Sequence, residues 1–181
     1  MADPRDPRPL TGEPLSLDLL NTRWAGTPVN DLLADLDGYR TWLSSVGLAE
    51  RCPADPAGLE AVREAREALA ALVGAAEREQ PAPLDGLNRV LAHGRLRHRL
   101  GERGPQRSVE VDDPHRLAAW LAADNYLDLL DQGAHRIKAC AHPNCILHFF
   151  DTSQNGRRRW CSMALCGNRA KAARHYEKAT R

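Results

Sequence analysis

The sequence lacks the features that mark export, membrane insertion and the common catalytic sites. It does not start with a basic stretch followed by an apolar one, and it has no apolar run of about 18 residues. We therefore expect a cytoplasmic protein that does not associate with a membrane. A glycine-rich phosphate loop, a nucleophile elbow and a helical His-Glu-x-x-His are all missing, so we do not expect an enzyme.

Cysteine is scarce, and its distribution is uneven. Four of the five cysteines lie within residues 135–181. In a reducing compartment, clustered cysteines are more often metal ligands than disulfides. The fifth, Cys52, stands alone beside Pro53, and we interpret it as an inert thiol.

The formal net charge of +1 conceals a polarised chain. Residues 1–134 have 15 Lys and Arg against 22 Asp and Glu, a net charge of −7. Residues 135–181 have 10 against 2, a net charge of +8. Such an asymmetry indicates a basic module attached to an acidic body.

The body, residues 15–134, is predicted to be an α+β domain that is mainly helical. The alternation in Leu15–Leu19 predicts a short strand, and residues 95–100 and 107–111 flank a Gly-Glu-Arg-Gly-Pro turn that favours a hairpin. Apolar residues recur at helical spacing in several segments. The helices predicted from this spacing cover residues 31–46, 56–79, 84–92 and 114–131.

The N-terminal segment and the first predicted strand give two further expectations. Residues 1–14 are rich in proline and charge, so we expect a loose tail. Asp18, Asn21 and Thr22 could line a polar pocket for a small-molecule effector, although such residues more often satisfy backbone groups where a strand ends.

The four clustered cysteines have the spacing of a structural zinc site. Cys140 and Cys145 form one pair, Cys161 and Cys166 form the other, and 15 residues separate the pairs. Each pair folds a loop over one side of the ion, and four thiolates leave no coordination position open for water. We predict one structural Zn²⁺, which a module of this size needs in order to fold. His142 and His148 are alternative ligands close to the first pair.

The segments around the cysteines predict the rest of the module, residues 135–181. Asn155-Gly156 favours a hairpin between Leu147–Phe150 and Arg158–Trp160. Ser162 is a candidate N-cap for a helix from Met163 to about Lys178. A cysteine knuckle, a hairpin and a helix in this order predict a treble-clef-like zinc finger.

Two motifs resemble known families. Cys166-Gly167-Asn168-Arg169, followed by Ala-Lys-Ala-Ala-Arg and preceded by the other cysteine pair, resembles the CGNR zinc finger. Leu17-Asp18-Leu19-Leu20-Asn21-Thr22 resembles the strand that opens the ABATE domain, which commonly precedes this finger in bacterial proteins. The resemblance implies a stress-linked bacterial transcription regulator that binds DNA through the finger.

The predicted helix separates a basic face from a packing face. At 100° per residue, Lys171, Arg174 and Lys178 share one side, and Arg157–Arg159 add a second basic element. We predict that these residues contact DNA phosphates. RNA or an acidic protein surface could be bound in the same way, so a protein- or RNA-interaction module is the alternative.

Arg169 is predicted to have a structural role. It lies on the packing side of the helix, where its guanidinium could bind backbone carbonyls of the knuckle or hairpin. Gly167 and Asn168 would then allow the helix to approach the knuckle closely. We also expect that loss of zinc unfolds residues 135–181 while the body stays folded.

Overall fold

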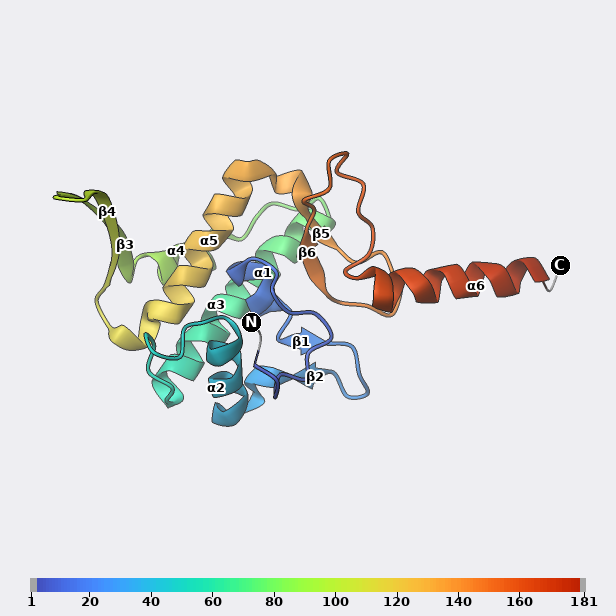
Figure 1. Cartoon of the computed structure of the whole chain (residues 1–181), viewed down its shortest axis with the longest axis horizontal. Helices are drawn as coiled ribbons and strands as arrows, with labels where there is room; N and C mark the ends of the chain where they lie inside the picture. The colour runs from blue at the N-terminus through green and yellow to red at the C-terminus, as the bar shows by residue number, and fades with distance from the viewer. Residues whose placement is uncertain (1–2, 180–181) are drawn as a thin grey trace.

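A computed structural model describes the backbone of residues 3–179 and the side chains of residues 3–173. The chain forms a mainly helical body, from which a β-hairpin and the C-terminal helix project at opposite ends (Figure 1). The α-helices are α1 (Leu15–Leu20), α2 (Leu36–Ser45), α3 (Pro56–Glu77), α4 (Leu84–Leu91), α5 (Leu117–Gly133) and α6 (Asn168–Ala179). Shorter turns are the 3₁₀ helices η1 (Leu32–Ala34), η2 (Pro114–Arg116) and η3 (Ala134–Arg136), and the π-helix η4 (Met163–Gly167).

The strands form three separate antiparallel pairs. β1 (Arg23–Trp24) pairs with β2 (Asn30–Asp31), and β3 (Gly94–Gly101) pairs with β4 (Gly104–Val111). In the finger, β5 (Ile137–Ala139) pairs with β6 (His148–Phe150). The hairpin predicted for residues 95–111 is thus confirmed, with Glu102 and Arg103 as its turn.

Helix α3 is the centre of the body. The Asp55 side chain accepts a hydrogen bond from the Gly58 amide, which caps the helix, and Pro56 fits its first turn. Most of the apolar stripe predicted for this helix is buried, including Val62 and Leu69 at 0% exposure, although Ala76 is exposed. Helices α1, α2, α4 and α5 pack around α3 to form the main core. No helix within residues 3–179 combines the length and the apolarity that crossing a bilayer requires.

The prediction of a strand at Leu15–Leu19 is wrong, because these residues form helix α1. Alternation suggests one buried and one exposed face, yet α1 is buried on all sides. Its polar residues are covered as well: Ser16 binds the Asn125 side chain, and Asp18 is 2% exposed. Alternation along a segment that is buried all round carries no information about its period.

The N-terminal segment is not a loose tail over the described residues 3–14. The Arg8 side chain is fully buried and forms ion pairs with Asp6 at 2.7 Å and Asp18 at 2.6 Å. Asp18 also accepts a hydrogen bond from the indole of Trp42. The charged residues that suggested a solvated tail are therefore paired inside the fold, which offsets the cost of burying them.

The zinc finger departs from the prediction in its middle section. Strand β6 pairs with β5 rather than with Arg158–Trp160, which form an irregular loop. Gly156, with φ of 60°, provides a turn within this loop instead of joining two strands. Ser162 precedes the π-helix η4, but its side chain makes no capping hydrogen bond.

Candidate metal centre

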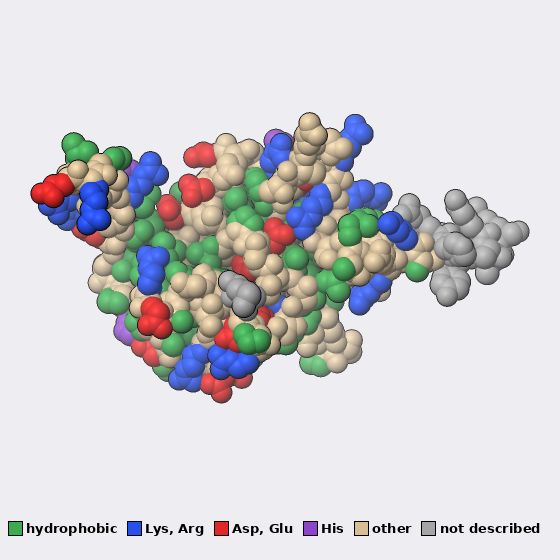
Figure 2. All heavy atoms as spheres, in the orientation of Figure 1, with side chains coloured by type: hydrophobic (Ala, Val, Ile, Leu, Met, Phe, Trp, Pro, Cys, Tyr) green, Lys and Arg blue, Asp and Glu red, His purple; other side chains and the backbone are tan. Residues whose placement is uncertain are grey.

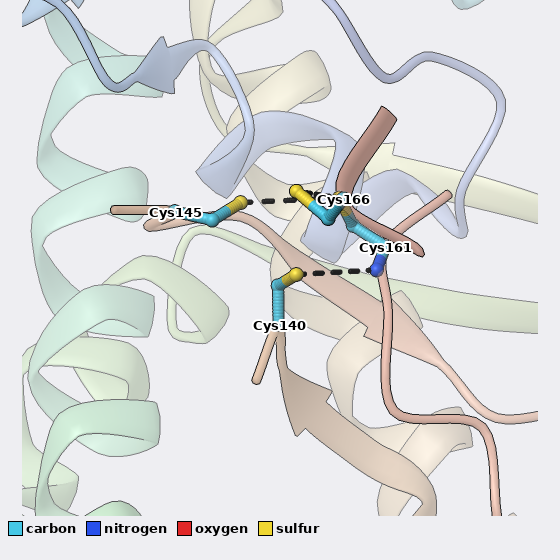
Figure 3. Close-up of side chains that lie close together, drawn as sticks. All are labelled: Cys140, Cys145, Cys161 and Cys166. Atoms are coloured by element: carbon cyan, nitrogen blue, oxygen red, sulfur yellow. Dashed lines mark hydrogen bonds between the residues drawn. The ribbon is translucent and has the colours of Figure 1, made fainter. Parts of the chain in front are cut away.

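The four predicted ligands come from two places in the finger and meet at one point (Figure 3). Cys140 directly follows β5, and Cys145 lies in the connection between β5 and β6. Cys161 ends the irregular loop, and Cys166 lies in the π-helix that leads into α6. A knuckle and a helix start therefore face each other across the site, as in a treble clef.

The sulfur positions fit a tetrahedral zinc ion. The four Sγ atoms all lie within 4.8 Å of one another. The Cys145–Cys161 and Cys161–Cys166 sulfurs are 3.8 and 3.6 Å apart. Zinc–sulfur bonds of about 2.3 Å at tetrahedral angles place the sulfurs about 3.8 Å apart, whereas a disulfide joins them at about 2.0 Å. These residues form a site for one structural zinc ion, and the thiols are not oxidised to disulfides.

The electrostatics of the thiols favour a cation between them. Burial, together with the neighbouring Cys145, raises the pKa of Cys161 far above its usual value. Burial likewise raises the pKa of Cys166 to about 11. Cys140 is also buried, but hydrogen bonds, first that from the Cys161 amide, leave its pKa below the ordinary value. A divalent ion at the centre attracts each thiolate and so outweighs the repulsion between neighbouring thiolates.

The two histidines that were alternative ligands are engaged elsewhere. His142 Nδ1 accepts a hydrogen bond from the Asn144 amide within the knuckle. His148 Nε2 lies 2.9 Å from the Glu77 carboxylate at the end of α3. Neither ring belongs to the group of side chains that converge on the site.

Asp151 organises the loop between β6 and the second cysteine pair. Its carboxylate is fully buried and accepts hydrogen bonds from Lys138 Nζ at 2.7 Å and from the Arg158 amide at 2.9 Å. The Lys138 ammonium, helped by bonds from Ser153, holds the pKa of this carboxyl far below its usual range. Lys138 also donates to the Gly156 carbonyl, so one side chain holds the start and the middle of the loop.

Arg158 acts as a clamp inside the finger, and its predicted contact with DNA stays a prediction. Its guanidinium donates to the carbonyls of Trp160 and Cys161 and to the Glu13 carboxylate. It also lies over the Phe149 ring, 4.2 Å from the centroid. These partners hold the guanidinium inside the finger, although the side chain is still 30% exposed.

The internal role predicted for Arg169 is not what the structure has. Arg169 is exposed, and among the described residues its guanidinium has no hydrogen-bond partner. Asn168 is exposed as well. Gly167 is the buried member of the motif, and a Cβ there would lie 2.6 Å from the Met163 sulfur. The close approach predicted at Gly167 therefore exists, but Arg158 is the arginine that ties the module together.

The other predicted DNA contacts whose side chains the structure describes lie at the surface of the finger. Arg157, Arg159 and Lys171 are not buried. Arg157 and Arg159 line two neighbouring hollows of about 480 and 510 Å³. In Figure 2, Lys and Arg side chains gather over the loop and the start of α6. The predicted contacts Arg174 and Lys178 have side chains outside the described residues.

The candidate effector pocket at Asp18, Asn21 and Thr22 is closed. The three residues are at most 2% exposed. The Thr22 hydroxyl donates to the Leu19 carbonyl and accepts from Arg66. The Asp18 carboxylate accepts from Arg8 and Trp42. Asn21 is paired with His148. Their polar groups are therefore used within the protein and are not offered to a ligand.

Sequence reasoning missed the residues that join the finger to the body. The Asn21 amide exchanges two hydrogen bonds with the His148 backbone, at 2.8 and 2.9 Å. Glu13 accepts from the Phe150 amide and from Arg158, and Leu10 and Trp24 pack against the apolar cluster that contains the buried cysteines. The hydrogen-bonded partners lie more than 100 residues apart in the chain, and no local motif marks such pairs.

The fold and the site define a four-cysteine zinc finger attached to a helical body. Family models match both parts of the chain. Residues 136–179 match the CGNR zinc finger, and residues 13–133 match ABATE, described as "Putative stress-induced transcription regulator". The chain belongs to the ABATE family, which confirms the resemblance inferred from the two motifs. Among curated proteins, none matches the chain.

Proposed function

We propose that the chain is a DNA-binding transcription regulator that contacts duplex DNA through the exposed basic residues of its zinc finger. The observation that carries this proposal is the set of cationic side chains that reach the surface around the metal centre. These are Arg157, Arg159, Arg169 and Lys171. They are independent of the internal ion pairs that occupy Lys138 and Arg158.

The charge of the finger supports contact with phosphates. Residues 135–181 carry a net charge of +8 with neutral thiols. Four thiolates and one Zn²⁺ contribute −2, so the zinc-loaded finger keeps a charge of +6. Phosphate contacts of this kind are independent of sequence and weaken steeply with salt. The four-thiolate site leaves zinc without an open position, which supports a binding role rather than catalysis at the metal.

The position of the arginines also suits a groove-binding element. The backbone amide of Ala141 in the knuckle binds the Arg159 carbonyl at 2.9 Å, which holds the loop beside the knuckle. Helix α6 begins directly after the π-helix that contains Cys166, so Lys171 projects from a helix anchored at the zinc site. An anchored helix with basic residues can enter the major groove of duplex DNA.

The test is the affinity of the zinc-loaded full chain for random duplex DNA, measured by fluorescence anisotropy over a range of salt concentrations. We expect R157A/R159A to weaken binding and to flatten the salt dependence by about one unit of slope for each phosphate that is no longer bound. The control R51A/R89A removes the same charge from exposed positions of the body. Equal effects of the two variants would contradict the proposal.

Selection of bound fragments from random duplexes then tests specificity. Enrichment of a sequence motif would establish a regulator with a defined site. Tighter binding to single-stranded RNA, or binding only to an acidic protein surface, would favour the interaction module instead.

A further inference from the structure

The β3–β4 hairpin, residues 94–111, is a second basic element, and it lies outside the zinc finger. We call it the arm. It contains five arginines and two glutamates, a net charge of +3. The other residues of 1–134 have 10 Lys and Arg against 20 Asp and Glu, a net charge of −10. The arm is therefore a basic projection on a strongly acidic body.

The arm is fixed at its base and free beyond it. At the base, the His93 ring lies 2.8 Å from the Asp112 carboxylate. A Cβ at Gly94 would lie 2.6 Å from the Trp120 ring, so the strand leaves the body in close contact with α5. From Arg95 to Leu100 every residue is exposed, and Figure 1 shows the arm standing away from the helices. Eight residues per strand give a length of roughly 27 Å.

The arginines of the arm divide into two groups. Near the base, Arg95 and Arg97 both bind the Glu110 carboxylate, at 2.8 and 2.7 Å. Towards the tip, Arg99, Arg103 and Arg107 are exposed, and none of their guanidinium groups forms an ion pair or hydrogen bond with another described residue. The basal pair stiffens the ribbon, and the distal three leave their guanidinium groups available.

The tip combines this charge with exposed apolar groups. Leu100 is 82% exposed and lies directly opposite Pro105 in the strand register. Figure 2 shows apolar and basic side chains side by side at this end of the molecule. Proteins that bind the minor groove place arginines along it and insert apolar side chains between base steps, with leucine and proline among those used.

We propose that the arm is a second DNA-binding element, in which Arg99, Arg103 and Arg107 contact phosphates while Leu100 and Pro105 press against bases in the minor groove. This inference rests on the proposed function for its ligand, duplex DNA, but it depends on different residues. Charge complementarity selects this ligand, because guanidinium groups on both faces of a narrow ribbon match a groove with phosphates on both sides. An acidic protein surface would match the arginines but would leave the exposed Leu100 and Pro105 without a role.

The first experiment measures phosphate contact with the zinc-loaded full chain and random duplexes. We expect R99A/R103A/R107A to lose tenfold or more in affinity at low salt and to flatten the salt slope by about two to three units. R40A/R51A/R89A, which removes three exposed arginines from the body, is the matched control. Equal affinities of the two triple variants would overturn the inference.

The second experiment measures contact with the bases. Binding of the unchanged chain should raise the fluorescence of 2-aminopurine placed in the duplex, because the base becomes unstacked. Leu100→Ser should abolish this rise while the affinity falls only a few-fold. A rise that survives Leu100→Ser, or no rise with the unchanged chain, would overturn the role of the tip.

The outcomes for the arm and for the finger can be told apart. Loss of affinity in the finger variant R157A/R159A alone would leave the proposed function standing and overturn the arm. Loss of affinity in the arm variant R99A/R103A/R107A alone would support the arm and overturn the proposed role of the finger. Sedimentation velocity without DNA tests whether the arm instead binds a second copy of the chain. Self-association that disappears in R99A/R103A/R107A would make the arm a protein contact and overturn its assignment to DNA.

Discussion

Arg158 and Arg159 are adjacent in the sequence and have opposite surroundings. Arg158 donates to three backbone carbonyls and to Glu13, so it holds the loop, the second cysteine pair and the N-terminal segment together. Arg159 is exposed, and its guanidinium lies 5.2 Å from the centroid of the Trp160 ring. At the scale of single residues, a run of like charges therefore contains both a structural and a surface residue.

This difference predicts unequal effects of the same conservative change. Arg158→Lys should lower the free energy of unfolding by roughly 1–3 kcal/mol, because an ammonium cannot reproduce a planar fork of donors and leaves carbonyls unpaired. It should also speed the loss of zinc to a chelator. Arg159→Lys, the matched control, should change neither. Thermal unfolding and a colorimetric zinc-release assay measure both effects, and equal stabilities would show that the clamp contributes nothing.

The sequence was sufficient to predict the four cysteines but not the roles of the arginines. Thiol spacing along the chain is itself the signal of a zinc site, so Cys140, Cys145, Cys161 and Cys166 follow from local information. The role of an arginine depends on which acceptors surround it, and these come from elsewhere in the fold. Helical angle placed Arg169 on a packing face, but among the described residues no carbonyl on this face accepts from its guanidinium.

Helix α1 and strand β6 are the elements that connect body and finger. Asn21, directly after α1, pairs with the backbone of His148 through both its amide oxygen and its amide nitrogen. The side chain thus acts as a strand partner at the first residue of β6. Burial of this pair, with Asn21 only 1% exposed, makes its loss costly.

We expect Asn21→Ala to loosen the finger without disturbing the zinc ligands. The variant should lose about 1–3 kcal/mol of stability, because the His148 amide and carbonyl are left unpaired. Amide hydrogen exchange should rise at residues 137–150 and stay unchanged in α3. Asn88→Ala, at an exposed position of α4, is the control. Unchanged exchange in the finger would mean that Asn21 does not hold the two elements together.

Helices and strands were predictable from the sequence where one face is buried and the other is exposed to solvent. Helix α3 has such a stripe, and so its extent was predicted to within a few residues. Helix α1 has no solvent-exposed face, and the alternation of its leucines predicted a strand instead of a helix. Asn155-Gly156 correctly predicted a turn. Strand β6, however, pairs with β5 across the knuckle and not with the residues that follow this turn.

At the scale of the whole molecule, the finger and the body share their cores. Phe150 and Ile137 of the finger pack into the main core, while Leu10 and Trp24 pack against the cysteine cluster. We therefore no longer expect the finger to unfold alone, and we expect the finger and the body to unfold together. Loss of the metal removes support from residues that belong to both parts.

We predict a single thermal transition for the zinc-loaded chain, and a lower, still single transition after chelation. Cys161→Ser should reproduce the second state with less than one zinc per chain by elemental analysis. Ser162→Ala, next to it but without a capping bond, should behave as the unchanged protein. Two separate transitions, with the body melting as before, would show that the shared contacts are too weak to couple the two parts.

The bond between Glu13 and Arg158 also has a consequence for biosynthesis. The two residues lie 145 positions apart, and at about 5–20 residues per second the ribosome needs roughly 7–30 s to make the second after the first. During most of that interval Glu13, Asn21 and Trp24 have been synthesised, but the residues that they contact in the finished fold have not. The body and the finger can therefore join only after translation has passed the second cysteine pair, which makes their association a late step of biosynthesis.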